Sequence, residues 1–397
     1  MHLVREVLKF TTPTDKILSN CFREHKKITS YERALIAETI YSILRNYYKL
    51  TQIAQQNIPD IVGLSWLKIL NFKPSQLDNL KLIDLPRLLK LNFAATQLSK
   101  LELPQWIIDQ LQQAYTESEI EQLAFSLQQA APLDLRVNLI KNNLNEVLKE
   151  LSPLGAKKMQ YSPFGLRLYN KTFLAKHKLF LNGSIEVQDE ASQLAGQLLN
   201  PKRGEMIADF CAGSGGKTLL FGMLMRNSGR IYALDISEER LNNLSPRLAR
   251  SGLSNVYPQL INSETDAKLK RFHNKIDRVF VDAPCSGLGT LRRNPELKFR
   301  QTLSTISELN LKQASILSAA SKLVKPSGYL VYATCSILPQ ENQQIVQQFL
   351  LKHAEFKLVP AATVIKNPAF ARSDGFLVLL PHIHQCDGFF AALMQKD

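Results

Sequence analysis

The sequence predicts an α/β protein whose C-terminal half forms a doubly wound, mostly parallel sheet. Three observations support this prediction. From about residue 185 onward, short apolar stretches typical of buried strands alternate with helical patterns. Acidic residues end several of these stretches, as they do at the ligand-binding edge of such sheets. Residues 1–184 have a different pattern: helical segments come first, and a small unit with both strand and helix patterns follows them.

Size and composition indicate several domains in one globular chain. The chain has 397 residues, of which 45% are hydrophobic and 21% charged. This composition is normal for a globular protein, and the length exceeds that of one ordinary domain. We expect a helical domain over residues 1–128, a small α+β domain over 129–184 and the α/β domain over 185–397. The chain has neither a long apolar span nor a signal-peptide pattern, so we expect a cytoplasmic protein with no membrane partner.

Capping signals and prolines predict the short helices of the first domain. Thr29 and Glu32 have the spacing of a capping box, and Thr116 and Glu119 repeat that spacing. Apolar residues follow each box at helical intervals. Three prolines between the boxes divide the chain into short helices: Pro74, Pro86 and Pro104.

The middle domain is predicted to be a small α+β unit. Leu133–Val137 alternates as a strand does, Leu144–Leu151 has a helical pattern, and Leu166–Tyr169 is typical of a second strand. A basic stretch that contains one acid, Glu150, covers the second half of this domain. It is either a solvated lysine-rich face or a surface that follows a phosphate backbone. Its basic residues are Lys149, Lys157, Lys158, Arg167, Lys171, Lys176 and Lys178.

The α/β domain contains four clear strand patterns and one weaker pattern. Ligands of doubly wound sheets bind at the carboxyl ends of the strands, where the strand order reverses. The residues that follow each strand are therefore the candidate site residues. The clear strands are Met206–Phe210, Arg230–Asp235, Arg278–Asp282 and Tyr329–Thr334, and the weaker one is Val256–Ile261.

The first strand leads into a glycine-rich turn, Asp209–Thr218. A phosphate-binding P-loop would need a glycine at Cys211, and a dinucleotide fingerprint would need one at Thr218, so neither motif is complete. What remains is D-x-x-x-G-x-G-G, a form used by folds that bind S-adenosylmethionine (SAM), or an ordinary strand-to-helix turn. Asp235 ends the second strand, where a carboxylate can accept ribose hydroxyls or cap the following helix.

Five widely spaced cysteines contain no C-x-x-C pair, so we expect free thiols and neither a zinc site nor a disulfide framework. Two of them, Cys285 and Cys335, follow two strands that are neighbours in such a sheet. Either alone is typical of a small buried residue, but the two together beside a SAM turn indicate chemistry. A thiolate that adds to C6 of cytosine makes C5 reactive enough to accept a methyl group. Such a reaction also needs an acid at N3, for which Asp282 is the candidate, and a group that helps elimination.

These segments resemble the motifs of the Nop/Sun (RsmB/Fmu-like) family of RNA cytosine-5 methyltransferases. The resemblance covers about residues 132–397 and implies a Rossmann-like, class I SAM-dependent methyltransferase domain with SAM as cofactor and no metal. The matching segments are Asp209–Lys217, Asp282–Ser286, Arg292–Lys298, Thr334–Ser336, Pro339–Asn342, Val187–Ser192 and Asp387–Phe390.

The resemblance also implies a role for each residue. Chemistry alone does not say which of the two cysteines is the nucleophile. Cys335 would be the nucleophile, Cys285 would assist release or elimination, and Asp282 would hold the cytosine edge. The family's acid on the adenine side of SAM falls near Asn262 or Ser263, of which we assign Ser263, while Glu264 and Asp266 lie close but out of alignment. The other residues implied to bind SAM are Cys211, Ala212, Gly213, Ser214, Gly215, Gly216, Lys217 and Asp235, together with Asp282.

RNA is the expected partner. The formal net charge is +14, and such an excess suggests a polyanionic ligand. A basic run after Cys285 is expected to clamp the RNA backbone, with a solvated charge run as the alternative. That run contains Arg292, Arg293, Lys298 and Arg300.

The N-terminal domain bears on which RNA is modified. The segment from Tyr31 to Arg45 resembles the first helix of the NusB-like domain in bacterial family members that modify small-subunit ribosomal RNA. We therefore expect a reduced NusB-like domain and a 16S ribosomal RNA substrate, with tRNA as the rival. A non-catalytic ribosome-assembly factor is the alternative from another class, which the paired cysteines disfavour. We expect a monomer.

Overall fold

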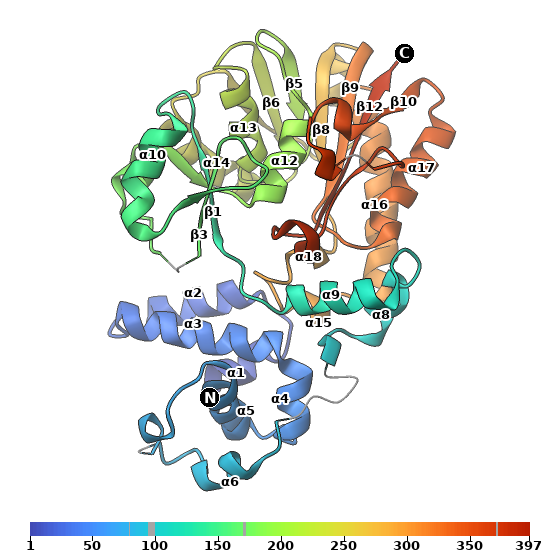
Figure 1. Ribbon diagram of the computed structural model, residues 1–397. Helices are drawn as coiled ribbons and strands as arrows, with labels where there is room; N and C mark the ends of the chain where they lie inside the picture. The colour runs from blue at the N-terminus through green and yellow to red at the C-terminus, as the bar shows by residue number, and fades with distance from the viewer. Residues whose placement is uncertain (79, 94–99, 170–171, 371) are drawn as a thin grey trace. The chain divides into compact units, whose positions relative to one another are not determined.

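The computed structural model describes residues 1–78, 80–93, 100–169, 172–370 and 372–397, and the chain forms two compact units (Figure 1). The first unit contains Met1–Ala130 together with Thr290–Leu303. The second contains Ala131–Gly289 and Ser304–Asp397. The α+β and α/β regions therefore lie in one unit, while a short segment that follows the Cys285 loop belongs with the N-terminal helices.

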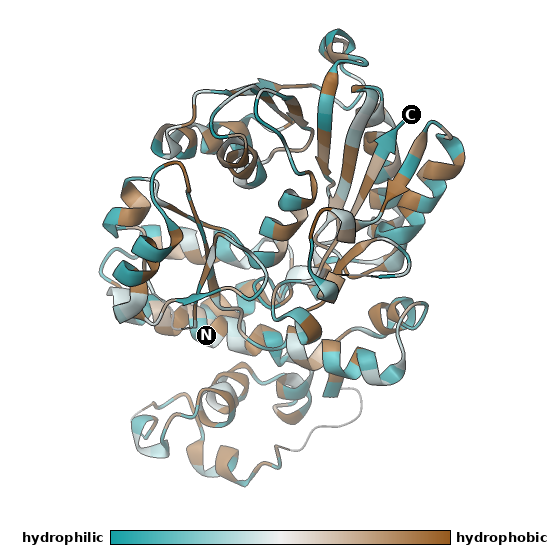
Figure 2. Cartoon of the chain, turned by 45° about the horizontal axis from the view of Figure 1, so that its top comes forward, coloured by the Kyte–Doolittle hydropathy of each residue, from teal (hydrophilic) through white to brown (hydrophobic). Residues whose placement is uncertain are grey.

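The first unit is helical, as its capping signals predict. The side chains of Thr29 and Thr116 each accept a hydrogen bond from the backbone of the glutamate three residues on, which completes two reciprocal capping boxes. Its helices mix hydrophobic and hydrophilic residues, as amphipathic helices do (Figure 2). They are α1 (His2–Val7), α2 (Thr14–Glu24), α3 (Ser30–Arg45), α4 (Tyr47–Ile53), α5 (Ile58–Leu64), α6 (Leu85–Lys90), α8 (Gln105–Leu111), α9 (Glu117–Leu127) and α15 (Leu297–Arg300).

Helix α15 is held in this unit by an aromatic cluster. The ring of Phe299 stacks on Phe10 with ring centroids 4.5 Å apart and meets the edge of Tyr47 at 4.7 Å. Tyr48 lies on the same ring at 5.5 Å. Aromatic pairs at such distances bury large areas and add specific geometry, so the segment is an integral part of the helical core.

The second unit begins with a small antiparallel sheet of strand order β2-β3-β1-β4. The predicted strand Leu133–Val137 and helix Leu144–Leu151 are confirmed. Apolar side chains from both pack together in one core, which includes Leu135, Leu166 and Val147. The elements are β1 (Leu133–Val137), α10 (Leu144–Leu151), β2 (Lys157–Lys158), β3 (Gly165–Leu168), α11 (Lys178–Leu181) and β4 (Ile185–Val187).

The large sheet has the strand order β10-β12-β9-β8-β5-β6-β7, with β11 paired to β12. All five predicted strands are confirmed, and they pair in parallel. They are β5 (Met206–Asp209), β6 (Arg230–Asp235), β7 (Val256–Leu260), β8 (Ile276–Asp282) and β9 (Val324–Thr334). Helices pack along this sheet (Figure 1). They are α12 (Glu190–Leu198), α13 (Gly216–Leu224), α14 (Glu238–Ser251), α16 (Leu303–Ser321) and α17 (Gln343–Lys352), while the short helix α18 (Pro381–His384) follows strand β11.

The sheet is mixed: the five predicted strands are parallel, as expected, and one antiparallel strand lies next to β9. Strand β12 (Phe389–Lys396) runs antiparallel to β9 and pairs antiparallel with β10 (Phe356–Val359) and β11 (Leu377–Leu379). Its first six residues are buried, so it is a nearly continuous apolar run without the alternation that marks an exposed strand.

The strand order brings the predicted site residues to one edge. Strand β5 lies between β6 and β8, so the order along the sheet reverses there and opens a crevice at the carboxyl ends. Asp209, Asp235, Asp282 and Thr334 each end one of the four central strands. Among the described residues, no helix is long and apolar enough to cross a membrane.

Candidate active site

A cavity of about 570 Å³ lies at this edge, lined entirely by residues of the second unit. Its wall contains both candidate cysteines, Cys285 and Cys335, together with Asp282. Most of the residues expected to bind SAM also line it: Cys211, Ala212, Gly213, Ser214, Gly216, Lys217 and Asp235. Chemical groups that the sequence separates by over a hundred residues thus share one pocket.

The glycine-rich turn has the backbone conformation that glycine favours. Gly213 and Gly215 have φ angles of 55° and 83°. A Cβ built on Gly215 would lie 2.1 Å from Cδ1 of Leu244, whereas one on Gly213 would meet nothing within 4 Å. Gly215 therefore packs the turn against α14 rather than lining the cavity, while Gly213 leaves open space beside the chain.

Asp235 connects the turn to the next strand. Its Oδ2 accepts a hydrogen bond from the Gly213 amide at 2.7 Å, and its Oδ1 accepts one from the Ser237 amide at 2.8 Å. The residue thus caps the local backbone and also faces the cavity. Each carboxylate oxygen has two lone pairs, so capacity remains to accept ribose hydroxyls.

Asp209, at the end of β5, is a buried acid behind the cavity. Its Oδ2 accepts a hydrogen bond from the Thr218 hydroxyl at 2.6 Å, while Oδ1 is buried without a partner. Burial raises the pKa of this carboxyl to about 7, and the nearby Asp282 adds to the rise.

Asp209 should make the folded protein less stable as pH rises from about 4 to about 7. The folded state holds its proton more tightly than the unfolded chain, so the unfolding free energy falls with pH across that window, on the order of a few kcal/mol. In Asp209→Asn this pH dependence should shrink, as measured by urea unfolding at pH 5 and pH 8. Glu238→Gln, an exposed acid at the start of α14, should leave it unchanged. The same pH dependence in Asp209→Asn and the wild type would refute the assignment.

The two candidate cysteines lie in contact. The Sγ atoms of Cys285 and Cys335 are 3.4 Å apart, within hydrogen-bond distance for sulfur. The hydrogen bond to Cys335 raises the pKa of the Cys285 thiol well above its ordinary value, and burial raises it further. Cys285 therefore keeps its proton and can donate it in a hydrogen bond to the sulfur of Cys335.

A lysine–aspartate pair lies in the same pocket. Nζ of Lys217 is 2.7 Å from Oδ2 of Asp282, and the lysine side chain is buried. Burial alone would lower the pKa of Lys217, but Asp282 outweighs it, Cys335 adds a smaller effect, and the pKa is raised overall. Lys217 thus stays charged, and a thiolate at Cys335 would lie in its field. The sequence indicated Lys217 only as part of the cofactor turn.

Glu341 joins the two cysteine loops, a role that the sequence did not reveal. Its buried carboxylate accepts hydrogen bonds from the amide and hydroxyl of Ser286, the hydroxyl of Ser336 and the side-chain amide of Gln313. Each serine directly follows a candidate cysteine. The only sequence signal was the P-x-E-N segment that contains Glu341.

Replacing Glu341 with glutamine should disorder both loops at once. The amide nitrogen cannot accept the hydrogen bonds that the carboxylate receives, so we expect the unfolding free energy to fall by about 2–4 kcal/mol. Chemical denaturation measures this loss, and methyl-transfer activity should fall with it. Gln344→Ala, an exposed residue of the following helix α17, should change neither quantity. Unchanged stability of Glu341→Gln would show that the loops are held by other contacts.

A third loop, which contains Gly388, packs against the two loops that carry the cysteines. The Gly289 amide donates to the carbonyl of Cys335 at 2.9 Å, and the Gly388 amide donates to the carbonyl of Gly289 at 2.8 Å. A Cβ built on Gly289 would lie 2.0 Å from the Gly388 carbonyl oxygen. Only glycines allow the three loops this close an approach, which explains the glycine of the Asp387–Phe390 segment.

Ser263, which we assign to the adenine side, and its neighbour Glu264 differ in whether they line the cavity. Ser263 does not line the cavity, and its hydroxyl hydrogen-bonds Thr265 at 3.1 Å. Glu264 lines the cavity instead, held by Lys312 at 2.6 Å and by the Ser315 hydroxyl at 2.8 Å. Of these two neighbouring residues, Glu264 thus faces the cavity and Ser263 does not.

The basic run after Cys285 is placed differently from the expected RNA clamp. Arg292 and Lys298 are buried in the first unit. Nζ of Lys298 donates to the carbonyl of Glu102 at 2.7 Å, and burial lowers its pKa to about 8. Nη2 of Arg45 donates to the carbonyl of Arg292 at 3.2 Å. These two residues anchor their segment among the helices, while Arg293 and Arg300 are partly exposed.

The basic stretch of the α+β region remains largely on the surface. Arg167 is the exception, because it is buried in a two-bond ion pair with Asp134 at 2.7 Å. Lys171 lies outside the described residues. The exposed members are Lys149, Lys157, Lys158, Lys176 and Lys178. Two aromatic side chains nearby in sequence, Tyr169 and Phe173, are also exposed. The part of the chain that the structure describes contains no cluster of histidine, cysteine and acidic side chains able to hold a metal.

Family models and curated proteins match most of the chain. A family described as 16S rRNA methyltransferase RsmB/F matches residues 196–395, and a ferredoxin-like domain of RsmF/B-like methyltransferases matches 103–173. The probable ribosomal RNA small subunit methyltransferase B of Synechocystis sp. is 38% identical over 298 residues, which are 74% of this chain and 66% of that protein. The ribosomal RNA small subunit methyltransferase B of Serratia proteamaculans is 33% identical, with coverages of 76% and 68%. The chain thus spans about two thirds of these relatives.

Solved structures show the same fold. The crystal structure of PH0851 matches with a TM-score of 0.83 and 27% identity, covering 99% of this chain and 97% of that one. A methyltransferase homolog protein from Pyrococcus horikoshii matches with a TM-score of 0.64 and 30% identity, covering 76% and 97%.

Proposed function

Because the chain belongs to the RsmB/F family of SAM-dependent RNA methyltransferases, we propose that it transfers a methyl group from SAM to carbon 5 of a cytosine in RNA. The observation that carries the proposal is the pair of thiols, Cys285 and Cys335, 3.4 Å apart in a cavity that also contains a SAM-type glycine turn. A protein that only binds RNA needs neither thiol.

The residues around the cavity fit SAM. Gly213 offers open space where a side chain would otherwise intrude, and the Asp235 carboxylate faces the cavity with acceptor capacity for a ribose. Ile236 and Ile261 line the wall beside Asp235, and apolar side chains of this kind suit an adenine ring. Glu264 takes the place of Ser263 as the acid on that side. When bound, SAM supplies an electrophilic methyl group.

Cys335 acts as the nucleophile in this mechanism. Its thiolate adds to C6 of the cytosine, and the electron pair of the C5–C6 double bond moves toward C5, which then takes the methyl group. Cys285, whose raised pKa keeps it protonated, donates a hydrogen bond to the attacking sulfur, and the Lys217 ammonium lines the same cavity. The target base must leave its stack to reach this cavity.

The Lys217–Asp282 pair serves the cytosine edge. The Lys217 ammonium donates a hydrogen bond to the Asp282 carboxylate at 2.7 Å, so N3 of the activated ring meets an ion pair in which the lysine holds the proton, rather than an isolated carboxylic acid. After methyl transfer, a base from the solvent takes the C5 proton, the electron pair of the C5–H bond re-forms the C5–C6 double bond, and the sulfur of Cys335 leaves C6 as a thiolate. The S–H of Cys285 stabilises the charge that develops on that sulfur.

The substrate that we propose is 16S ribosomal RNA, because the matching family and curated relatives carry that name. The helical unit would act as a reduced NusB-like RNA-binding domain. The exposed lysines of the α+β region, with Tyr169 and Phe173, provide charges for a phosphate backbone and rings for unpaired bases. In the basic run after Cys285, only Arg293 and Arg300 remain candidates for RNA contact.

Bisulfite sequencing of RNA from a strain without this gene tests the proposal. We expect one cytosine of small-subunit ribosomal RNA, protected in the parent strain, to become convertible in the deletion strain. Loss of protection only in tRNA would replace the proposed substrate with its rival. Identical protection patterns in both strains would refute cytosine-5 methylation as the function.

A further inference from the structure

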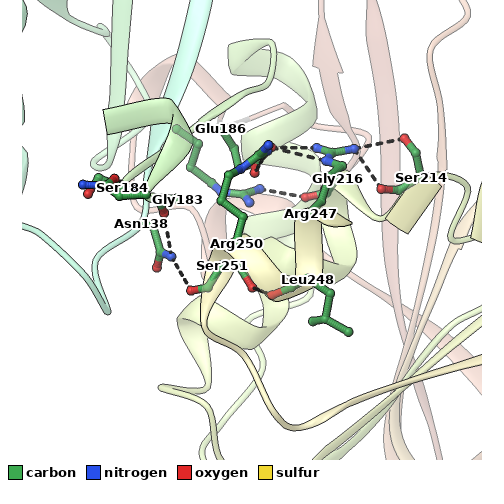
Figure 3. A network of polar contacts seen from close by, with 12 residues as sticks. Asn138, Gly183, Ser184, Glu186, Ser214, Gly216, Arg247, Leu248, Arg250 and Ser251 are labelled. Carbon is green, nitrogen blue, oxygen red and sulfur yellow. Dashed lines mark hydrogen bonds and ion pairs between the residues drawn. The ribbon is translucent and has the colours of Figure 1, made fainter. Parts of the chain in front are cut away.

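A network of buried charges connects the α+β region to the cofactor turn (Figure 3). At its centre is Glu186 of β4, whose carboxylate is buried and forms ion pairs with Arg247 and Arg250 of α14. Arg247 also reaches the turn: its Nη1 donates to the carbonyl of Ser214 at 2.8 Å and to the Ser214 hydroxyl at 3.0 Å. One guanidinium thus bridges Glu186 and the turn that follows β5.

The donors of Arg247 are almost fully used. Nε and Nη2 donate to Oε2 of Glu186 at 3.3 and 3.1 Å, and Nη1 makes both contacts to Ser214. A guanidinium has five N–H groups, so at most one remains for a ligand, although Arg247 lines the cavity. Its geometry therefore suits the positioning of the turn better than direct contact with a ligand.

A second arginine holds the same turn from the α+β region. Nη1 of Arg136, on β1, donates to the carbonyl of Gly216 at 2.7 Å. Arg136 is buried, which lowers its pKa to about 10, and Glu186 partly offsets the burial. The backbone of the turn is therefore fixed at two carbonyls, at Ser214 by Arg247 and at Gly216 by Arg136.

The α+β region is packed tightly onto the helix that carries Arg247. The side-chain amide of Asn138 donates to the carbonyls of Gly183 and Ser251 at 3.1 and 3.0 Å, which joins the small sheet to the end of α14. A Cβ built on Gly183 would lie 2.0 Å from the Arg250 carbonyl oxygen. These contacts fix the distance between β4 and α14, so Glu186 holds Arg247 at a defined place.

We propose that Arg247, oriented by Glu186, is a positioning residue that keeps the Ser214–Gly216 turn in its SAM-binding conformation. The inference rests on the proposed cofactor role of that turn. It assigns to the α+β region a part in cofactor binding in addition to any contact with RNA. The glycine-rich turn that contains this segment has two glycines with positive φ, Gly213 and Gly215, so its unbound conformations are many, and fixing its carbonyls lowers the entropic cost of binding SAM.

Arg247→Ala should weaken SAM binding about tenfold, measured by titration calorimetry on the full chain with SAM. Because the chemical groups are untouched, KM for SAM should rise while kcat changes little. Arg247→Lys should not restore affinity, since one ammonium cannot bridge Glu186 and Ser214. Glu186→Gln should also weaken SAM binding. The double variant Glu186→Gln/Arg247→Ala should bind SAM about as weakly as Arg247→Ala alone, because both changes remove the same contact.

Arg250→Ala is the matched control, because Arg250 also pairs with Glu186 but makes no contact with the turn among the hydrogen bonds of the described residues. It should keep SAM affinity within about twofold of the wild type. Wild-type affinity in both Arg247→Ala and Arg247→Lys would overturn the inference, and so would an equal loss in Arg250→Ala, which would indicate a general structural role. A wild-type protein that binds no SAM would instead refute the proposed function.

Discussion

Cys335→Ala should abolish methyl transfer, with a loss of at least about 10⁴-fold in turnover. Without the thiol, C5 of cytosine remains too weak a nucleophile to take the methyl group. The loss should appear as the absence of tritium in RNA after incubation with SAM labelled in its methyl group. Since Cys335 lines the cavity at the end of β9, and the glycine turn follows β5, SAM affinity should stay close to the wild-type value.

Two comparisons make this result interpretable. Cys21→Ala removes a thiol from the helical unit and should leave activity intact. Titration calorimetry with SAM distinguishes two causes of lost activity. A variant that lacks only the nucleophile still binds SAM, whereas a variant with a disrupted cavity does not. Activity retained by Cys335→Ala would remove Cys335 as the nucleophile and make Cys285 the next candidate.

Cys285→Ala should trap the enzyme on its RNA. The Cys285 sulfur lies 3.4 Å from that of Cys335 and keeps its proton, so it is placed to stabilise the departing thiolate. Without it the bond between Cys335 and C6 should break slowly, and turnover should fall about 10²- to 10⁴-fold. The covalent protein–RNA adduct should appear as a slow-migrating band on a denaturing gel in the presence of SAM.

The double variant Cys285→Ala/Cys335→Ala is the control for this band. It should form no adduct, because the sulfur that bonds to C6 is absent. A Cys285→Ala protein that turns over without accumulating an adduct would exclude a role for Cys285 in release. An adduct that persists in the double variant would place the covalent bond on another residue.

Local patterns predicted the strands and the cavity wall because their causes are local. A buried parallel strand is apolar along its length, and a glycine turn after it has a fixed spacing, so Asp209–Lys217 could be placed from sequence alone. The convergence of Cys285 and Cys335 followed from the strand order. The antiparallel β12 was missed because a buried strand without alternation resembles any other short apolar run.

The remaining differences arise from contacts between distant residues. A lysine such as Lys298 is typical of a surface, but it is buried here because it donates a hydrogen bond to the carbonyl of Glu102, nearly two hundred residues away in the sequence. Glu341 can contact both cysteine loops because the pairing of β8 with β9 brings the two loops together, which no local sequence pattern indicates. Glu186 lies on β4 of the small sheet and Arg247 on helix α14 of the α/β region, and no spacing in the sequence predicts their contact.

Methylation of cytosine C5 can be measured directly. The purified protein is incubated with an unmodified small-subunit ribosomal RNA transcript and SAM that carries a deuterated methyl group. The RNA is then digested and its nucleosides are separated by mass spectrometry. The account predicts deuterated 5-methylcytidine with the wild type and none with Cys335→Ala. Label on a different nucleoside, or equal labelling by both proteins, would contradict it.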